Sequence, residues 1–196
     1  NRAGVPLLEI VTFPDMHSLE EVDKFMTALR DILLYIGVSD CKMQEGSLRF
    51  EANISLKPPG QPELGTKVEM KNLNSFKIVI AALQYEIRRQ EKLLSEGKNV
   101  AQETRLWDDK ERKTHSMRSK EEAHDYRYFP EPDLPPLLIT EKMIEEIRSS
   151  LPELPSLRFE RFCRDYNLPA YVALLIFLSP KLADFYEDAA ATAVGV

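Results

Sequence analysis

Two neighbouring segments of the chain gather acidic and basic side chains on one side of an expected sheet. In residues 47–57 and 67–71, polar and apolar residues alternate, so each segment has one polar face. The charged and amide positions on these faces are Arg49, Glu51, Asn53, Lys67, Glu69 and Lys71. Carboxylates hold Mg²⁺ and basic groups hold nucleotide phosphates, so one interpretation is the floor of a nucleotide site. The alternation alone favours the other interpretation, which is the solvated outer face of an antiparallel sheet.

Glu9 is a third candidate for metal or phosphate chemistry. It interrupts an otherwise apolar run, residues 5–11, which is typical of a buried strand that ends before Pro14. A carboxylate inside such a strand is costly unless a metal or an arginine compensates it. A glutamate at the strand end that points to solvent is the alternative, and the residues leave both open.

Other chemistry-bearing residues give weaker signals. Glu103 and Arg105 share a strand face with Trp107, and His115 follows on the next strand, where a lone histidine is more often a packing or surface residue. Cys41 has no histidine near it in the sequence, so no nucleophile is assigned. Neither of the glycine-rich phosphate-binding motifs G-x-x-x-x-G-K-[ST] and G-x-G-x-x-G occurs, and an ATP site would therefore need another design.

The elements that must position these side chains follow from periodicity. A capping box at Ser18 and Glu21 opens an amphipathic helix over 18–36 that Gly37 ends, and a second long helix is predicted over 75–96. With the strands above, the predicted order is strand, helix, two strands, helix. Segments 100–107 and 114–118 flank a charged turn and predict a further hairpin.

A change in composition divides the chain near residues 130–140. Eight of the 13 prolines lie at or beyond Pro130, and the helical patterns there are short, at 140–150, 156–166, 169–178 and 179–191. We expect an α+β domain over residues 1–135, with a mainly antiparallel sheet and helices on one face, followed over 136–196 by a linker and the start of an all-helical domain.

Composition excludes several classes of protein. Twenty-six Lys and Arg against 32 Asp and Glu give a net charge of −6, which argues against a nonspecific nucleic-acid coat. No apolar run approaches the roughly 18 residues of a membrane span, and the 2 cysteines encode neither a disulfide framework nor a zinc site. A reducing, cytosolic setting is expected. Because the chain opens at Asn1, we expect it to be a fragment of a longer protein.

Five long motifs, in order, resemble the GatB family, the B subunits of the tRNA-dependent aspartyl/glutamyl amidotransferases. They are NRAGVPLLEIV (1–11), MQEGSLRFEANISL (43–56), GTKVEMKNLNSF (65–76), QETRLWD (102–108) and SMRSKEEAHDYRYFPEPDLPPL (116–137). The PELP at 152–155 and the helices after it are similar to the opening of that family's helical domain. The resemblance implies a fold like glutamine synthetase and the guanido kinases, of which this chain would hold the C-terminal half of a cradle and be inactive alone.

The activity that the resemblance implies is a ligase reaction on misacylated tRNA. ATP with Mg²⁺ phosphorylates the side-chain carboxylate of Glu-tRNA(Gln), Asp-tRNA(Asn) or both, and ammonia from the glutaminase (A) subunit then attacks the acyl phosphate. The complex also holds a small (C) subunit, is cytoplasmic and has no membrane partner. The alternative, of a different class, is a noncatalytic scaffold that docks tRNA and the glutaminase subunit.

The resemblance also implies roles for individual residues. Glu9 and Glu51 match acidic family positions and are expected as metal-side carboxylates, with Arg49 beside them in catalysis. The expected contacts to nucleotide or substrate carboxylate are Lys67, Lys71, Asn53, Arg105 and Arg118. Two departures stand out: Phe13 replaces an acidic residue of the family's T-E-P-D motif, and Glu51 stands where many relatives carry Asp.

Overall fold

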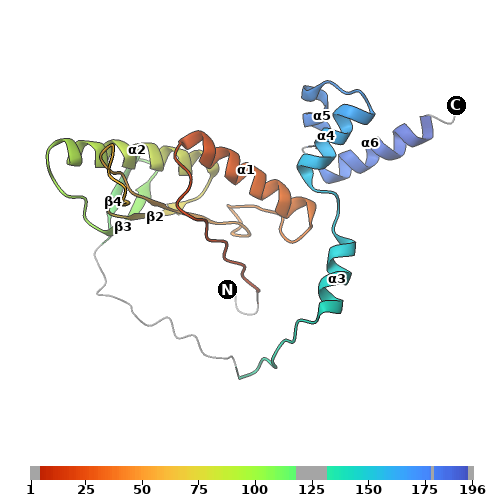
Figure 1. The fold of residues 1–196 in the computed structure, drawn as a ribbon, viewed down its shortest axis with the longest axis horizontal. Coiled ribbons are helices and arrows are strands. Elements are labelled where there is room, and N and C mark those ends of the chain that lie inside the picture. Colours follow the sequence, from red (N-terminus) through yellow and green to blue (C-terminus); the bar gives the residue numbers. More distant parts are fainter. Residues whose placement is uncertain (1–4, 118–131, 178, 194–196) are drawn as a thin grey trace.

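The computed structural model describes residues 5–117, 132–177 and 179–193, drawn in colour in Figure 1. It is an α+β protein, as predicted. Its elements in chain order are α1 (Leu19–Tyr35), β1 (Phe50–Ile54), β2 (Val68–Leu73), α2 (Phe76–Ser95), β3 (Glu103–Asp108), β4 (Lys113–Ser116), α3 (Glu141–Ser150), α4 (Pro155–Asp165), α5 (Ala170–Phe177) and α6 (Pro180–Ala193).

The four strands form one sheet in the order β1-β2-β3-β4. β1 pairs with β2 and β3 pairs with β4 in antiparallel fashion, whereas β2 and β3 are parallel. Two of the three strand pairings are thus antiparallel, as predicted, and the one parallel pairing makes the sheet mixed. The physical reason is α2, which carries the chain back across the sheet between β2 and β3, and such a crossover makes the two strands parallel.

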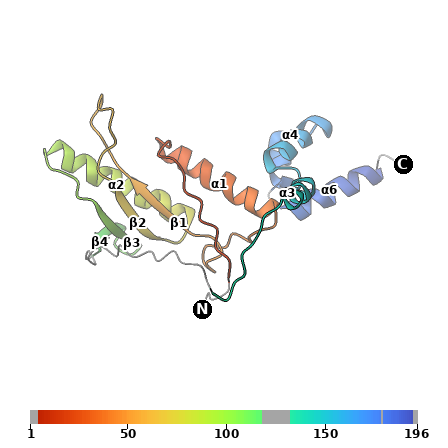
Figure 2. The same cartoon turned by 60° about the horizontal axis from the view of Figure 1, so that its bottom comes forward.

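Helices α1 and α2 cover one face of this sheet, and the core lies between them. Met70, Val79 and Trp107 are buried there, and Phe50 and Ile54 pack against them, as the alternation of β1 predicted. Figure 2 brings the sheet forward, with the strands in front of α2. Among the described residues no helix covers the other face, which we call the open face.

Local signals in the sequence account for the starts of both long helices. The Ser18 side chain accepts from the backbone N–H of Glu21, and the Glu21 side chain accepts from the backbone N–H of Ser18, which completes the capping box. Ser75 caps α2 by accepting from the backbone N–H of Ile78 at 3.2 Å. Both predicted helices are confirmed.

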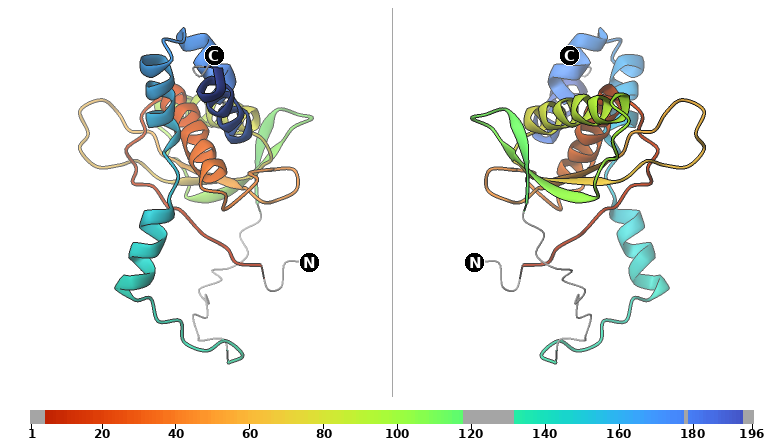
Figure 3. Two further views of the ribbon diagram at one scale, coloured as in Figure 1. Left: turned by 90° about the vertical axis from the view of Figure 1, so that its right-hand side faces the viewer. Right: turned by 90° about the vertical axis from the view of Figure 1, so that its left-hand side faces the viewer.

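The predicted buried strand at residues 5–11 is wrong. The segment is not a strand in the structure (the dark red trace in Figure 3), and its apolar side chains are exposed, including Leu7 at 91%. A strand needs a neighbour that takes its backbone hydrogen bonds, and no described strand pairs with this segment. The apolar residues of this segment favour burial, but the described helices and strands do not cover them.

The four short helices predicted in the second part of the chain are all present. α4, α5 and α6 pack around Phe162, Ala173 and Ala183. This unit contacts the end of α1, where the Tyr35 hydroxyl donates to the carbonyl oxygen of Phe177 at 3.1 Å and the two rings stack with centroids 5.4 Å apart. No helix in the described part of the chain is long and apolar enough to cross a membrane.

Candidate functional site

The open face carries the charged side chains that the alternation placed together. Asn53 on β1 lies opposite Glu69 on β2, and the register shifts between Phe50 and Ala52, which leaves Glu51 in an irregular stretch of β1. Burial alternates along both strands, so Glu51, Glu69 and Lys71 project away from the core.

Ionic contacts join β1 and β2 on this face, and a hydrogen bond from a neutral side chain extends them to β3. Lys71 Nζ lies 3.4 Å from Glu69 Oε1 and 3.9 Å from Glu51 Oε2, between the two carboxylates. Arg49 Nη2 lies 3.7 Å from the other oxygen of Glu51. On the parallel neighbour β3, the Thr104 hydroxyl donates to Glu69 Oε2 at 2.6 Å. The array therefore alternates in sign across the sheet.

These ion pairs are loose and open to solvent. Their nitrogen to oxygen distances of 3.4–3.9 Å exceed those of direct charge-assisted hydrogen bonds, and the Lys71 side chain is 40% exposed. Exposed pairs of this kind contribute only about 0–1 kcal/mol to stability. A ligand with phosphates can therefore replace the carboxylates as partner of Lys71 at low cost.

The donor set of the open face fits a hard divalent cation. Glu51 and Glu69 offer carboxylate oxygens, which are the ligands Mg²⁺ prefers, and three of these four oxygens have only loose contacts, at 3.4–3.9 Å. Lys71 stands between them and would have to turn towards an anionic ligand when a cation binds. Basic groups and carboxylates on one surface are what a magnesium-nucleotide complex requires.

The structure places the other predicted residues in different surroundings. Glu9 lies in the exposed N-terminal segment, and no hydrogen bond or ion pair joins it to another described residue, so the structure does not bring it to Glu51. Lys67 directly precedes β2 and is exposed, as is Asn53 on β1. Arg118 lies outside the described residues.

Arg105 lies on the covered face of the sheet, away from Glu51 and Lys71. It neighbours Met70 in the β2–β3 register, and its side chain is only 12% exposed. Its guanidinium donates to the Thr114 hydroxyl at 2.8 Å and to Glu103 at 2.7 Å, and lies 3.6 Å from Glu86. Its surroundings are those of a structural ion pair.

The side chains that contact Arg105 or one another beneath the sheet form one group, which we call the buried ion cluster. Its members are Glu86, Arg89, Glu103, Arg105 and Thr114. Glu86, from α2, is fully buried and accepts from Arg89 at 2.6 Å, from the Gln90 amide at 3.0 Å and from the Thr114 hydroxyl at 3.3 Å. A buried carboxylate is tolerated when it is paired and hydrogen-bonded in this way. The cluster therefore ties α2 to β3 and β4 beneath the open face.

The pKa of Glu103 reflects its place at the edge of this cluster. Burial alone would raise the pKa of this carboxyl, but hydrogen bonds from Ser116 and Arg105 and the positive charges of Arg105 and Arg89 outweigh it. The pKa is lowered from its ordinary value. Glu103 is thus held ionised by the cations around it.

Sequence reasoning gave no role to three residues that the structure places at key positions. Glu86 was findable, because it continues the buried stripe of α2 at three- and four-residue spacing from Val79, Ala82 and Gln90. Glu69 was noted on the polar face without a role. Thr104 gave no signal, because its contact depends on the parallel pairing of two strands that α2 separates.

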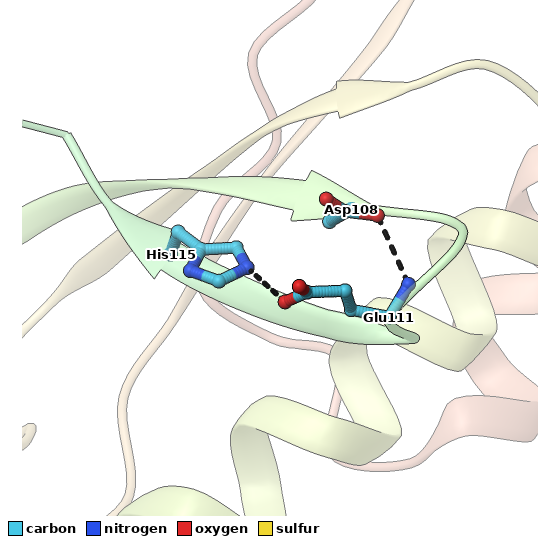
Figure 4. A group of neighbouring side chains, drawn as sticks. All are labelled: Asp108, Glu111 and His115. Carbon is cyan, nitrogen blue, oxygen red and sulfur yellow. Dashed lines mark hydrogen bonds and ion pairs between the residues drawn. The ribbon is translucent and has the colours of Figure 1, made fainter.

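A second polar group lies at the β3–β4 hairpin, where Asp108, Glu111 and His115 offer ligand atoms within 4.8 Å of one another (Figure 4). Contacts within the hairpin account for the closeness of these three side chains. The Glu111 backbone N–H donates to Asp108 at 3.0 Å, and Glu111 Oε2 lies 2.9 Å from His115 and 2.8 Å from Lys113. The hydrogen bond from Lys113, more than that from His115, lowers the pKa of Glu111. With Lys113 already on that oxygen, we assign the group to the turn.

Comparisons with known proteins identify relatives over nearly the whole chain. Residues 1–145 match the family described as the GatB/GatE catalytic domain. The chain is 58% identical over 190 residues to the aspartyl/glutamyl-tRNA(Asn/Gln) amidotransferase B subunit of Thermoanaerobacter sp. (strain X514), covering 97% of this chain and 40% of the relative. The corresponding B subunit of Carboxydothermus hydrogenoformans is 56% identical over 190 residues, with the same coverage. The chain thus spans about 40% of the length of these relatives.

Proposed function

Because the chain belongs to the GatB/GatE catalytic domain family, we propose that it supplies the ATP-using part of a tRNA-dependent amidotransferase. In the proposed ligase reaction, the side-chain carboxylate of Glu-tRNA(Gln) or Asp-tRNA(Asn) takes the γ-phosphoryl group of ATP and ADP leaves. Ammonia then attacks the acyl phosphate, and inorganic phosphate leaves as the amide forms. The proposed partners are the misacylated tRNA, a glutaminase (A) subunit, which releases the ammonia, and a small (C) subunit. The proposed setting is the cytoplasm.

The observation that carries this proposal is the exposed array of Glu51, Lys71 and Glu69 on the open face. Phosphoryl transfer requires little covalent chemistry from the protein, and depends on positioning and on neutralising charge. When bound, Mg²⁺ supplies that neutralisation on the nucleotide phosphates, and Glu51 and Glu69 are the residues of the array that would hold it. Glu9 remains a predicted third carboxylate.

The basic groups of the open face act on the anionic ligands. Lys71 turns from its two carboxylates towards a phosphate oxygen, which its loose contacts at 3.4 and 3.9 Å allow. Arg49, at the exposed edge of the array, and Lys67 are placed to bind a phosphate or the substrate carboxylate. Asn53 can orient a water or a phosphate oxygen through its amide.

A noncatalytic scaffold that docks tRNA and the glutaminase is the second candidate. One observation favours it: Glu9 is exposed and is not joined to the open face in the described structure. If the carboxylates of the family's motifs face solvent separately, the open face would be a solvated surface and the chemistry would take place elsewhere.

One assay tests the proposed reaction, and the Glu51→Gln variant in the same assay separates the two candidates, because only the catalytic proposal expects that variant to lose amidation. The full-length protein is assembled with its glutaminase and small subunits and supplied with glutamine, Mg²⁺, ATP and either Glu-tRNA(Gln) or Asp-tRNA(Asn). We expect amidated tRNA to form only when ATP is present, on at least one of the two substrates. Amidation at the same rate without ATP would contradict the proposed function.

A further inference from the structure

Thr104 is the residue of the open face that makes the shortest contact with a carboxylate. Its hydroxyl donates to Glu69 Oε2 at 2.6 Å, a distance typical of a charge-assisted O–H···O⁻ bond. We propose that Thr104 is a positioning residue that holds Glu69 in the orientation needed for the ATP-dependent step. This inference rests on the proposed function of the open face.

The register of the sheet makes this contact a direct one. β2 and β3 run parallel with Glu69 opposite Thr104, so both side chains leave neighbouring strands on the same face. The other oxygen of the carboxylate, Oε1, lies 3.4 Å from Lys71. Glu69 is therefore bound at one oxygen by a neutral donor and approached at the other by a cation.

The backbone under Thr104 is held firmly. Its carbonyl oxygen accepts from the Met117 backbone N–H at 2.9 Å, and its neighbour Arg105 anchors β3 in the buried ion cluster on the opposite face. Threonine is β-branched and stiff about χ1, so a fixed backbone fixes the direction of its hydroxyl. The donor is thus preorganised rather than recruited by the ligand.

Without the hydroxyl, Lys71 becomes the one partner left to Glu69 among the described residues. The carboxylate would then turn towards Lys71, and their contact at 3.4 Å would tighten to a direct ion pair. A tighter pair withdraws Lys71 from an incoming phosphate and occupies the oxygens that Glu69 would offer a cation. Thr104 therefore keeps both charged groups available to the ligand.

The test uses the full-length protein in the assembled complex, with Thr104→Val, Thr104→Ser and Thr114→Val. Valine removes the hydroxyl while keeping the branched shape, and serine restores it. Thr114→Val is the matched control, because the Thr114 hydroxyl donates to Glu86 in the buried ion cluster and not on the open face. The measurements are kcat and KM for ATP in amidation, glutamine hydrolysis, magnesium-dependent ATP binding by calorimetry, and Tm.

We expect Thr104→Val to lower kcat/KM for ATP at least roughly tenfold, the scale of one hydrogen bond to a charged group. Calorimetric ATP affinity should fall with it, while Tm and glutamine hydrolysis stay at wild-type values, and Thr104→Ser should recover most of the loss. Thr114→Val should lower Tm and leave the kinetic constants of the folded enzyme unchanged.

Two results would overturn the role of Thr104. One is an active wild type with an equally active Thr104→Val variant. The other is a Thr104→Val variant whose losses follow a lowered Tm and are not recovered by serine, which would make the contact merely structural. A wild-type complex that forms no amidated tRNA with ATP would overturn the proposed function itself, and is distinguishable from both.

Discussion

On one face of the sheet the Thr114 hydroxyl donates to Glu86 beneath α2, and on the other the Thr104 hydroxyl donates to Glu69 in the open. Both faces combine glutamates with basic groups. In the buried ion cluster Glu86 is fully buried and hydrogen-bonded several times, whereas the Glu69 side chain is 31% exposed and keeps a loose cationic partner. Burial, rather than residue type, separates a structural carboxylate from one that is available to a ligand.

This difference has an energetic basis. A buried charge that loses its partner pays a large desolvation penalty, so the cluster under α2 must stay closed for the fold to persist. An exposed ion pair is worth little to the fold, so the open face can exchange its partners. Substitutions on the two faces should therefore separate stability from activity.

The largest effect on stability is expected at Glu86. Glu86→Leu leaves Arg89 and Arg105 beneath α2 without the carboxylate that joins them. We expect the free energy of unfolding to fall by about 3–5 kcal/mol, the usual cost of breaking a buried ion pair. Chemical denaturation of the full-length protein measures it, with Glu51→Leu on the open face as the control. Equal losses in the two variants would remove the distinction between the faces.

Thr114→Val should have the next largest effect. The substitution removes the hydroxyl that accepts from Arg105 at 2.8 Å and donates to Glu86 at 3.3 Å. Leaving a buried donor and acceptor without this partner is expected to cost about 1–3 kcal/mol of stability. The same denaturation experiment reports it, and a stability within about 0.3 kcal/mol of wild type would show that the cluster tolerates a missing member.

A pH-dependent effect is expected at Glu103. The folded-state pKa of Glu103 is lowered from its ordinary value, which is about 4.3. The contribution of the ionised carboxylate to stability is therefore fully present above that ordinary value. It is lost as the pH falls through the folded-state pKa. Glu103→Gln should lower stability by about 1 kcal/mol at neutral pH. Denaturation curves from pH 7 to pH 3 should show the gap closing in acid. A gap that widens as pH falls would contradict the assigned sign.

Lys71→Met should have the smallest effect on stability. Its contacts with Glu51 and Glu69 are exposed and longer than direct hydrogen bonds, so the free energy of unfolding should change by less than about 0.5 kcal/mol. ATP-dependent amidation should nevertheless fall, since the phosphate contact is lost. Thermal melting beside the amidation assay tests both. A strongly destabilised variant would place Lys71 with the structural residues.

Local signals made much of the fold predictable. The capping box at Ser18, the cap at Ser75 and the charged turn between β3 and β4 each act over a few residues, and the elements they predicted are present. The parallel pairing of β2 and β3 was not predictable, because it depends on where α2 returns the chain. The same holds for the N-terminal segment, whose apolar pattern depends on a neighbour to form a buried strand.

The candidate site was predictable on β1 and β2 and not on β3. Alternation alone placed Glu51 and Lys71 on one polar face, and burial confirms it. Alternation also grouped Arg105 with Trp107, but the side of the sheet that this pair occupies became clear only when Trp107 proved buried under α2. Charge patterns indicate which residues share a face, while tertiary packing decides which face is open.

The central claim, that the open face carries the ATP-dependent step, is tested most directly by Glu51→Gln in the assembled full-length complex. The change removes a negative oxygen ligand while keeping the size of the side chain. Amidated tRNA and hydrolysed glutamine are measured side by side. We expect amidation to fall by at least about 10²-fold, the scale of removing one preorganised charge-stabilising group, with glutamine hydrolysis largely intact. Amidation near the wild-type rate would contradict the claim and leave the open face as a solvated surface of a scaffold.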